Sequence, residues 1–120
     1  MATITPTVNN SVAYLDAVLV TWAAIGASDT CTAVQLAGYD CLSVQGLGTF
    51  DSASIAFQGS NDGTNFAALT AKSGTTAIAI TAAGAKTPNE NMVFTRPAST
   101  GGGGSTSTTV IALYAPHGRR

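Results

Sequence analysis

Charged side chains are scarce in this chain. Asp, Glu, Lys and Arg make up 9% of its 120 residues, whereas soluble domains average about 25%. Five basic residues against six acidic ones give a formal net charge of -1, which is too little positive charge to neutralise a nucleic-acid backbone. So few charges also give weak electrostatic protection against association. The composition excludes a nucleic-acid-binding protein and favours one that stays packed against a partner, such as copies of itself.

Long apolar runs are missing as well. A membrane-spanning helix needs about 20 consecutive apolar residues, and the sequence contains no such run. Residues 17–27 are apolar enough to suggest a secretory signal, but the first basic residue is Lys72. The positive segment that precedes the apolar core of a signal is therefore absent. We expect a protein without membrane association that is made and folded in a cytoplasm.

Groups that carry catalysis or bind metals are few. The single histidine, His117, stands three residues from the end of the sequence, where neighbours cannot hold a general base in place. Five of the six acids lie in or beside expected turns, where such side chains bond the local backbone. One histidine and two separated cysteines are too few ligands for a metal site. The sequence predicts a protein that is not an enzyme and has no cofactor, metal or small-molecule substrate.

The two cysteines, Cys31 and Cys41, are expected to be buried thiols. A cytoplasm keeps thiols reduced, and free cysteine commonly behaves as a small apolar core residue. A disulfide between them requires the two strands that carry them to pair side by side, and the sequence leaves that question open.

What the chain has in abundance is small residues in short alternating runs. Ala, Thr, Gly and Ser account for 62 of the 120 residues. Apolar runs of period two recur at intervals of roughly 8–12 residues, separated by turn residues, as in sandwiches and barrels. No stretch shows the 3.6-residue period of a helix. We predict an all-β fold with the following strands: residues 15–24, 30–37, 41–50, 52–59, 65–72, 75–81, 91–96 and 107–115.

Turn and loop signals separate these strands. The pair Asp62-Gly63 predicts a tight hairpin turn, and Pro97 is expected to end the strand before it. Residues 82–88 and 98–105 are expected to be loops. Gly46 and Gly48 within one strand indicate a bulge or a close backbone approach.

The aromatic residues divide into two expected groups. Those inside alternating runs should be core residues: Trp22, Phe50, Phe57, Phe66 and Phe94. The tyrosines are expected at the rim, with the ring packed and the hydroxyl in water: Tyr14, Tyr39 and Tyr114. Several exposed aromatic rings on one concave face would favour a carbohydrate-binding module.

Three segments are expected along the chain. Residues 1–14 form an extended N-terminal arm, residues 15–115 form the β-sandwich domain, and residues 116–120 form a flexible tail. The arm carries apolar residues and no charge, which suits docking on a partner better than exposure to water.

Four segments carry a resemblance to a known group of proteins: residues 43–50, 54–66, 93–97 and 108–113. Their succession of strand, Asn-Asp-Gly turn, glycine-rich loop and closing strand, within residues 41–115, resembles the small β-sandwich proteins of tailed-bacteriophage virions, especially the capsid decoration or cement proteins. The resemblance implies an antiparallel, jelly-roll-like β-sandwich of about seven to eight strands. It also implies a homotrimer on the capsid exterior that clamps neighbouring major capsid protein subunits and performs no chemistry.

This resemblance gives the functional hypothesis and its alternatives. The chain is expected to be a virion structural protein that passes through the host cytoplasm before assembly. The alternatives are a tail- or fibre-associated virion protein and a carbohydrate-binding or adhesin module. The candidate partner-binding residues are the apolar side chains of the arm and the arginines of the last third of the chain: Ile4, Val8, Val12, Tyr14, Arg96, Arg119 and Arg120.

Overall fold

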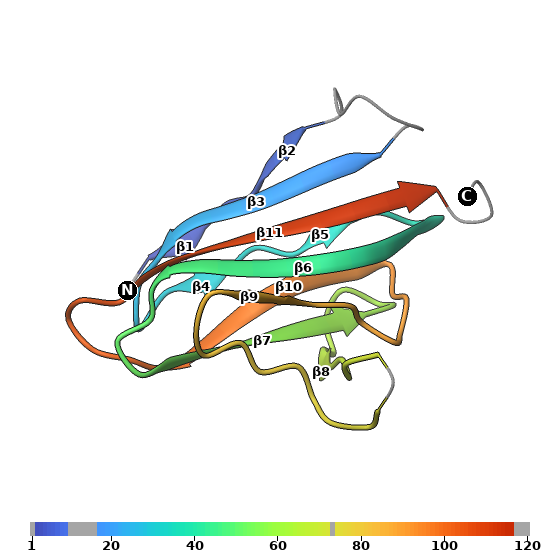
Figure 1. Ribbon diagram of the computed structural model, residues 1–120. Helices are drawn as coiled ribbons and strands as arrows, with labels where there is room; N and C mark the ends of the chain where they lie inside the picture. The colour runs from blue at the N-terminus through green and yellow to red at the C-terminus, as the bar shows by residue number, and fades with distance from the viewer. Residues whose placement is uncertain (1, 10–16, 73, 117–120) are drawn as a thin grey trace.

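The computed structural model describes residues 2–9, 17–72 and 74–116, and these residues are built from strands and connecting turns (Figure 1). No helix in this described part is long and apolar enough to cross a membrane. The strands are β1 (Thr3–Ile4), β2 (Thr7–Asn9), β3 (Val18–Ile25), β4 (Thr30–Cys31), β5 (Val34–Gln35), β6 (Tyr39–Thr49), β7 (Ala53–Ser60), β8 (Ala67–Ala68), β9 (Gly84–Lys86), β10 (Phe94–Gly101) and β11 (Ser107–Pro116).

Two antiparallel sheets contain most of the strands. One has five strands in the order β2-β3-β11-β6-β9, and the other has four in the order β5-β10-β7-β8. The short strands β1 and β4 form a separate parallel pair. The consecutive strands β6 and β7, like β10 and β11, lie in different sheets, so the chain crosses between the layers at these turns. The predicted all-β, antiparallel fold is confirmed.

The core lies between the two sheets, where alternating side chains from both meet. In β3, Val18, Val20 and Trp22 face inward and are buried, as the period-two pattern predicts. In β7, Ile55 and Phe57 do the same from the opposite sheet. These positions belong to one continuous apolar cluster, which makes the two layers a single packed unit.

A β-bulge in β3 shifts the alternation at its end. Trp22 pairs with Val110 and Ile25 pairs with Thr108, so two residues of β3 face one residue of β11 between them. Ala24 takes a positive φ of 57° at this point. The extra residue turns Ile25 inward, where it is fully buried. The bulge thus adds one large core residue that strict alternation would have pointed outward.

Glycine permits the close approach of β6 to β11, which confirms the expectation for Gly46 and Gly48. A Cβ at Gly48 would stand 2.5 Å from the backbone oxygen of Ser107, and its φ is +108°. A Cβ at Gly46 would lie 2.9 Å from Cγ2 of Ile80. The absence of a side chain at Gly48 therefore allows the backbone of β6 to approach Ser107 of β11, and its absence at Gly46 leaves room for the side chain of Ile80.

Pro97 does not end its strand, which corrects the sequence prediction. β10 continues through Pro97 to Gly101, where Pro97 pairs with Phe57 of β7. The carbonyl of Phe57 accepts a bond from Leu69 on its other side, so the Pro97–Phe57 pair exchanges no hydrogen bonds. The backbone nitrogen of Pro97, which carries no hydrogen, is therefore directed away from β7. On that side of β10 the partner strand β5 pairs only as far as Thr95, so no hydrogen bond is lost. Proline is tolerated in a strand at such a position.

Other boundaries also differ from the prediction. Residues 30–37 split into β4 and β5, which pair with different strands. Residues 65–72 and 75–81 contain only β8 and isolated bridges, although Leu69, Ile78 and Ile80 are buried. The expected loop 82–88 contains β9, which pairs with β6. The number of strands therefore exceeds the expected seven or eight, because several pairings are only two or three residues long.

The glycine-rich segment 98–105 is also only partly a loop. Its first residues belong to β10, which reaches Gly101. The turn that follows is held by its own hydrogen bonds, because Gly103 N donates to Thr106 Oγ1 and Thr106 Oγ1 donates to the Phe50 carbonyl. This connection between the sheets therefore has a specific bonded structure.

Replacing Gly48 by alanine should destabilise the protein strongly. The positive φ costs about 1–2 kcal/mol for a residue with a Cβ, and the contact with the Ser107 carbonyl forces backbone displacement that costs a further 1–3 kcal/mol or so. Urea denaturation of the Gly48→Ala variant should show a loss of about 2–5 kcal/mol in the free energy of unfolding.

The matched control is Gly104→Ala, since no atom lies within 4 Å of the added Cβ. Its free energy of unfolding should change by no more than about 0.5 kcal/mol. Equal losses in the two variants would contradict the close approach of β6 and β11.

Candidate partner-binding surfaces

Several of the described acidic side chains hold turns and connections between strands. Asp29 accepts hydrogen bonds from the backbone N–H groups of Gly26 and Ala2, and Glu90 accepts from Thr70 Oγ1 and N. These bonds lower the pKa of both carboxyl groups, mainly through Gly26 for Asp29 and the Thr70 hydroxyl for Glu90. No group of three or more His, Cys, Asp or Glu gathers within the described part of the chain. The acids that are described in these turns therefore serve local structure.

Asp62 organises the turn after β7. Its Oδ1 accepts hydrogen bonds from Ser60 Oγ and from the backbone N–H of Thr64 and Asn65, and its Oδ2 accepts from Asn65 Nδ2. The Asn65 backbone bond leads the effects that hold the pKa of Asp62 well below its usual range. The β7–β8 pairing ends at Gly59 and Ala67, so the turn is wider than the tight two-residue hairpin predicted from Asp62-Gly63.

Cys31 and Cys41 are separate, buried thiols. Cys31 lies in β4 of the two-stranded sheet and Cys41 in β6 of the five-stranded sheet. The strands that carry them do not pair, so the condition for a disulfide is not met. Burial raises the pKa of Cys31 to about 11 and that of Cys41 to about 12. Both groups therefore stay protonated and unreactive near neutral pH.

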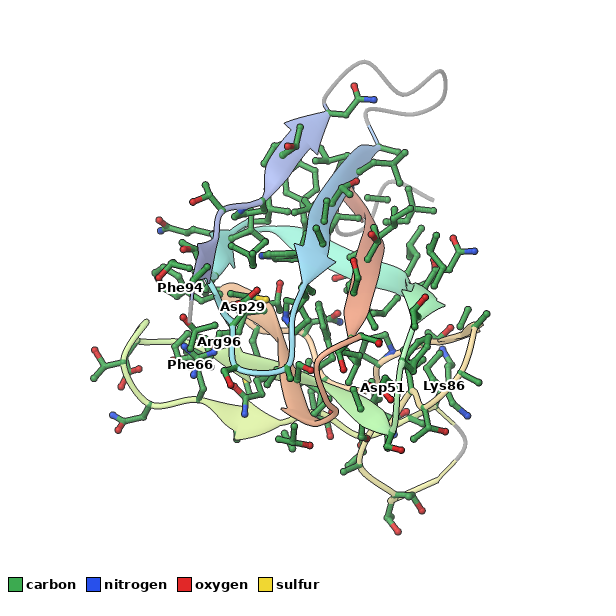
Figure 2. All side chains as sticks on the ribbon, turned by 90° about the vertical axis from the view of Figure 1, so that its left-hand side faces the viewer. Asp29, Asp51, Phe66, Lys86, Phe94 and Arg96 are labelled. Atoms are coloured by element: carbon green, nitrogen blue, oxygen red, sulfur yellow. The ribbon has the colours of Figure 1, made fainter. Side chains whose placement is uncertain are left out.

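The expected positions of three aromatic side chains are wrong. Tyr114, expected at the rim, is buried, and its hydroxyl shares a hydrogen bond with Thr95 of the facing sheet. Burial raises the pKa of this phenol far above its usual range. Phe66 and Phe94, expected in the core, are only half-buried. They lie instead beside Arg96 on one side of the molecule, as Figure 2 shows.

Arg96 is held in a fixed position on the outer face of the four-stranded sheet. It stands opposite Gln58 in the β10–β7 pairing, and its Nε donates a 3.0 Å hydrogen bond to Gln58 Oε1. Its Cζ lies 3.8 Å from the centroid of the Phe66 ring, a close cation–π contact. Among the described residues no carboxylate pairs with this guanidinium. We name Arg96, Gln58 and Phe66 the arginine platform.

A hollow of about 220 Å³ adjoins the arginine platform between β4 and β10. Its polar lining comes from Asp29 on one side and from Gln58, Arg96 and Ser99 on the other. The Ser99 Oγ is buried and has no hydrogen-bond partner. A buried hydroxyl without a partner is unusual, but Ser99 stands opposite the buried Ile55 and Arg96 stands opposite Gln58, so the two side chains lie on opposite faces of β10.

The outer face of the five-stranded sheet has a different character, because its exposed and half-exposed described residues carry no charge; Asp40, opposite Ala115 on this face, is buried. The register places Leu19 beside Leu113, and Ile111 between Thr21 and Gln45. The exposed and half-exposed outward residues of this sheet that the structure describes are apolar or neutral, and they include Thr7, Asn9, Leu19, Thr21, Ala23, Ser43, Gln45, Leu47, Ala85, Thr109, Ile111 and Leu113. We name this surface the uncharged face. Along their strands, Leu19, Ile111 and Leu113 alternate with residues of the core. This pattern in the sequence indicates that they lie on the outward face.

The described part of the N-terminal arm, residues 2–9, lies against its own domain. β1 pairs with β4 and β2 pairs with β3, so strand partners exist where none was evident from the sequence. Ile4 packs against the core cluster, whereas Val8 is 44% exposed and is the exposed large hydrophobic residue of the described chain. Of the other predicted contact residues, Val12, Tyr14, Arg119 and Arg120 lie outside the described residues. The structure does not bring Val8 and Arg96 together, since they belong to different sheets.

Alkaline pH should destabilise the fold through its buried thiols. Unfolded thiols ionise near pH 9.0, whereas the folded pKa values are about 11 and about 12. Between these pH values the unfolded chain releases thiol protons that the folded chain keeps. The contribution of the two thiols to the free energy of unfolding is therefore complete below pH 9 and is lost as the pH rises toward 12.

Urea denaturation at about pH 8 and about pH 10 measures this effect. A Cys31→Ala/Cys41→Ala double variant should lose less stability between the two conditions than the parent protein. Equal losses in both proteins would show that the thiols do not carry the pH dependence.

No protein-family model, curated protein or solved structure matches this chain. The function is therefore argued from the chain's own surfaces. The two that stand out are the uncharged face of the five-stranded sheet and the arginine platform with its adjoining hollow.

Proposed function

We propose that this protein is a non-enzymatic virion structural protein that binds the outside of a tailed-phage capsid and stabilises contacts between major capsid subunits. The observation that carries the proposal is the uncharged face. A half-exposed sheet surface with four large aliphatic side chains and no charge among its exposed or half-exposed described residues suits a partner surface better than water.

The all-β framework supports this role physically. Burying apolar surface contributes about 25 cal/mol per Å², and a flat sheet face offers that area without any rearrangement of its backbone. Many copies on one shell turn a modest contact into a large total stabilisation. The tightly bonded turns at Asp62 and Thr106 keep the sheet ends in place, so little ordering cost is added on binding.

The finer features of the proposal follow from the resemblance of the sequence to phage capsid decoration proteins. We propose a jelly-roll-like sandwich and a homotrimer on the particle surface. In this arrangement Val8, exposed on the edge strand β2, contacts the capsid or a neighbouring copy. The uncharged face supports self-association, because a surface without charge imposes no like-charge repulsion when copies of the chain meet.

The copy number per virion tests the proposal directly. Quantitative mass spectrometry of purified virions should find this 12.0 kDa chain in a simple ratio to the major capsid protein, near one-to-one or another fraction that implies hundreds of copies. A handful of copies would place the protein in the tail or its fibres. Its absence from virions would overturn the proposal and favour a cellular binding module.

A charge placed on the uncharged face should weaken particle binding. Leu113→Glu sets a carboxylate between Leu19 and Ser43, where a docked surface would have to desolvate it. Co-sedimentation with particles that lack the protein should show about a tenfold or greater loss of affinity.

The control is Ala77→Glu, which adds the same charge at an exposed residue outside the uncharged face. It should bind like the parent protein. Both variants should keep the parent's circular dichroism, and an unaltered affinity of Leu113→Glu would remove the uncharged face from the contact.

A further inference from the structure

The turn after β7 places two groups that can react with each other in adjacent residues. Asp62 precedes Gly63, and nowhere else in the sequence does a glycine follow an aspartate or asparagine. The backbone nitrogen of such a glycine can attack the aspartate Cγ, because no Cβ obstructs its approach. The N–Cγ bond forms, and the hydroxyl of the protonated carboxyl leaves as water with the proton of the nitrogen. Water then opens the resulting succinimide to aspartate or to isoaspartate, whose main chain runs through the former side chain.

The fold requires both residues of this pair. Gly63 has a φ of +78°, and a Cβ there would stand 3.2 Å from the ring of Phe94, so a larger residue would be strained and crowded. Asp62 supplies the oxygen that accepts the backbone N–H groups of Thr64 and Asn65. Both residues of the pair are exposed to water. The turn therefore keeps a reactive pair at the surface for structural reasons.

One buried hydroxyl holds both reacting groups. Ser60 Oγ donates a 2.7 Å hydrogen bond to Asp62 Oδ1 and accepts a 2.9 Å hydrogen bond from the Gly63 N–H. Ser60 is buried, so its position is fixed by the surrounding fold. Closing the succinimide ring requires the Gly63 nitrogen to release the proton that it donates to Ser60. The hydroxyl thus opposes the reaction at the attacking nitrogen and at the carboxylate together.

The other bonds of the Asp62 carboxylate act in the same direction. Its oxygens accept only from donors: the Ser60 hydroxyl, the backbone N–H groups of Thr64 and Asn65, and the Asn65 side-chain amide. Such donors favour the ionised form, and the Asn65 backbone N–H leads those that hold the pKa of Asp62 well below its usual range. An oxygen can leave as water only after the carboxylate has been protonated, so these bonds must break first.

We propose that Asp62-Gly63 is a site of spontaneous isoaspartate formation that the hydrogen bonds of the folded turn keep unreactive, with Ser60 restraining both reacting groups. The reaction then starts only from chains whose turn has opened, so its rate is the rate of the unfolded chain multiplied by the opened fraction. Isoaspartate lengthens the main chain by the Cβ atom between β7 and Phe66, the ring that lies against Arg96. The proposal does not rest on the proposed function.

The rate of isomerisation in folded and unfolded protein tests the proposal. The endoproteinase Asp-N cuts before aspartate but not before isoaspartate, so mass spectrometry of its digests gives the fraction isomerised at Asp62, with the cut before Asp51 as the internal reference. At neutral pH the folded chain should isomerise at least about tenfold more slowly than the same chain unfolded in urea, because several hydrogen bonds must break before the turn opens. Equal rates would overturn the protection, and an unfolded chain that forms no isoaspartate would overturn the site itself.

Variants of the turn identify the bonds that protect it. Asn65→Ala removes the side-chain bond to Asp62 Oδ2 at an exposed residue, and it should raise the rate in the folded protein about two- to tenfold. Ser60→Ala removes the hydroxyl that holds both groups and should raise the rate further. In urea both variants should react like the parent protein, since the Asp-Gly pair is unchanged.

The matched control is Thr64→Ala. It keeps the backbone N–H that bonds Asp62, and the Thr64 side chain makes no hydrogen bond among the described residues. Its rate should stay within about twofold of the parent's. Equal acceleration in Thr64→Ala and Asn65→Ala would contradict the role of the hydrogen bonds.

Hydrogen exchange separates local protection from overall stability. Exchange of the Gly63 amide reports opening of the turn, and in Ser60→Ala it should accelerate by the same factor as isomerisation, whereas exchange of the Val20 amide in the core should change less. Equal acceleration at both amides would show that Ser60 acts through the stability of the whole fold and not on the reacting groups. If Ser60→Ala does not fold, Asn65→Ala carries the same comparison.

Discussion

The packing of Trp22 is the constraint on which the other elements depend. Its ring is fully buried and meets Phe57 of the opposite sheet edge-on, with centroids 6.3 Å apart. Its Nε1 donates a 2.8 Å hydrogen bond to the carbonyl of Thr32. Because a buried indole N–H must find an acceptor, this bond fixes the link between β4 and β5 over the core. One side chain thereby positions both sheets and the segment that crosses from one to the other.

The position of the link between β4 and β5 explains why a hollow with polar lining residues opens beside β10. The link at Thr32 lies where β4 turns to its partner β1 and β5 turns to β10. β5 pairs with β10 only at Phe94 and Thr95, and β4 pairs with β1 instead, so this edge of β10 has no ladder beyond Thr95 in the described residues. Pro97 suits such an edge, and its neighbour Arg96 points to the outer face. The hollow beside the arginine platform thus lies where the link through Thr32 leaves the edge of β10 without a strand partner.

Period-two alternation was enough to predict the all-β fold and most of the core, since burial of every second residue is local information. Trp22, Phe50 and Phe57 are correctly predicted as core residues in this way. The errors arose where distant pairing decides the structure. Whether Pro97 ends a strand depends on which edge of β10 is paired, and the exposure of Phe66 depends on Arg96, thirty positions away. The uncharged face was implicit in the same alternation, but the unpartnered Ser99 hydroxyl could be found only from the folded chain.

The few charges of this chain are divided in a way that suits two different tasks. Acids such as Asp29, Asp62 and Glu90 are bonded within turns, so they stabilise connections and add little to the field around the molecule. The uncharged face offers area, which contributes affinity but little orientation. An isolated, pre-ordered guanidinium contributes the opposite, because a single directional pair fixes the register of a docked surface more than it adds affinity. Under the proposed function, the uncharged face supplies the strength of the contact through apolar burial, and we expect Arg96 on the second sheet to contribute to its orientation.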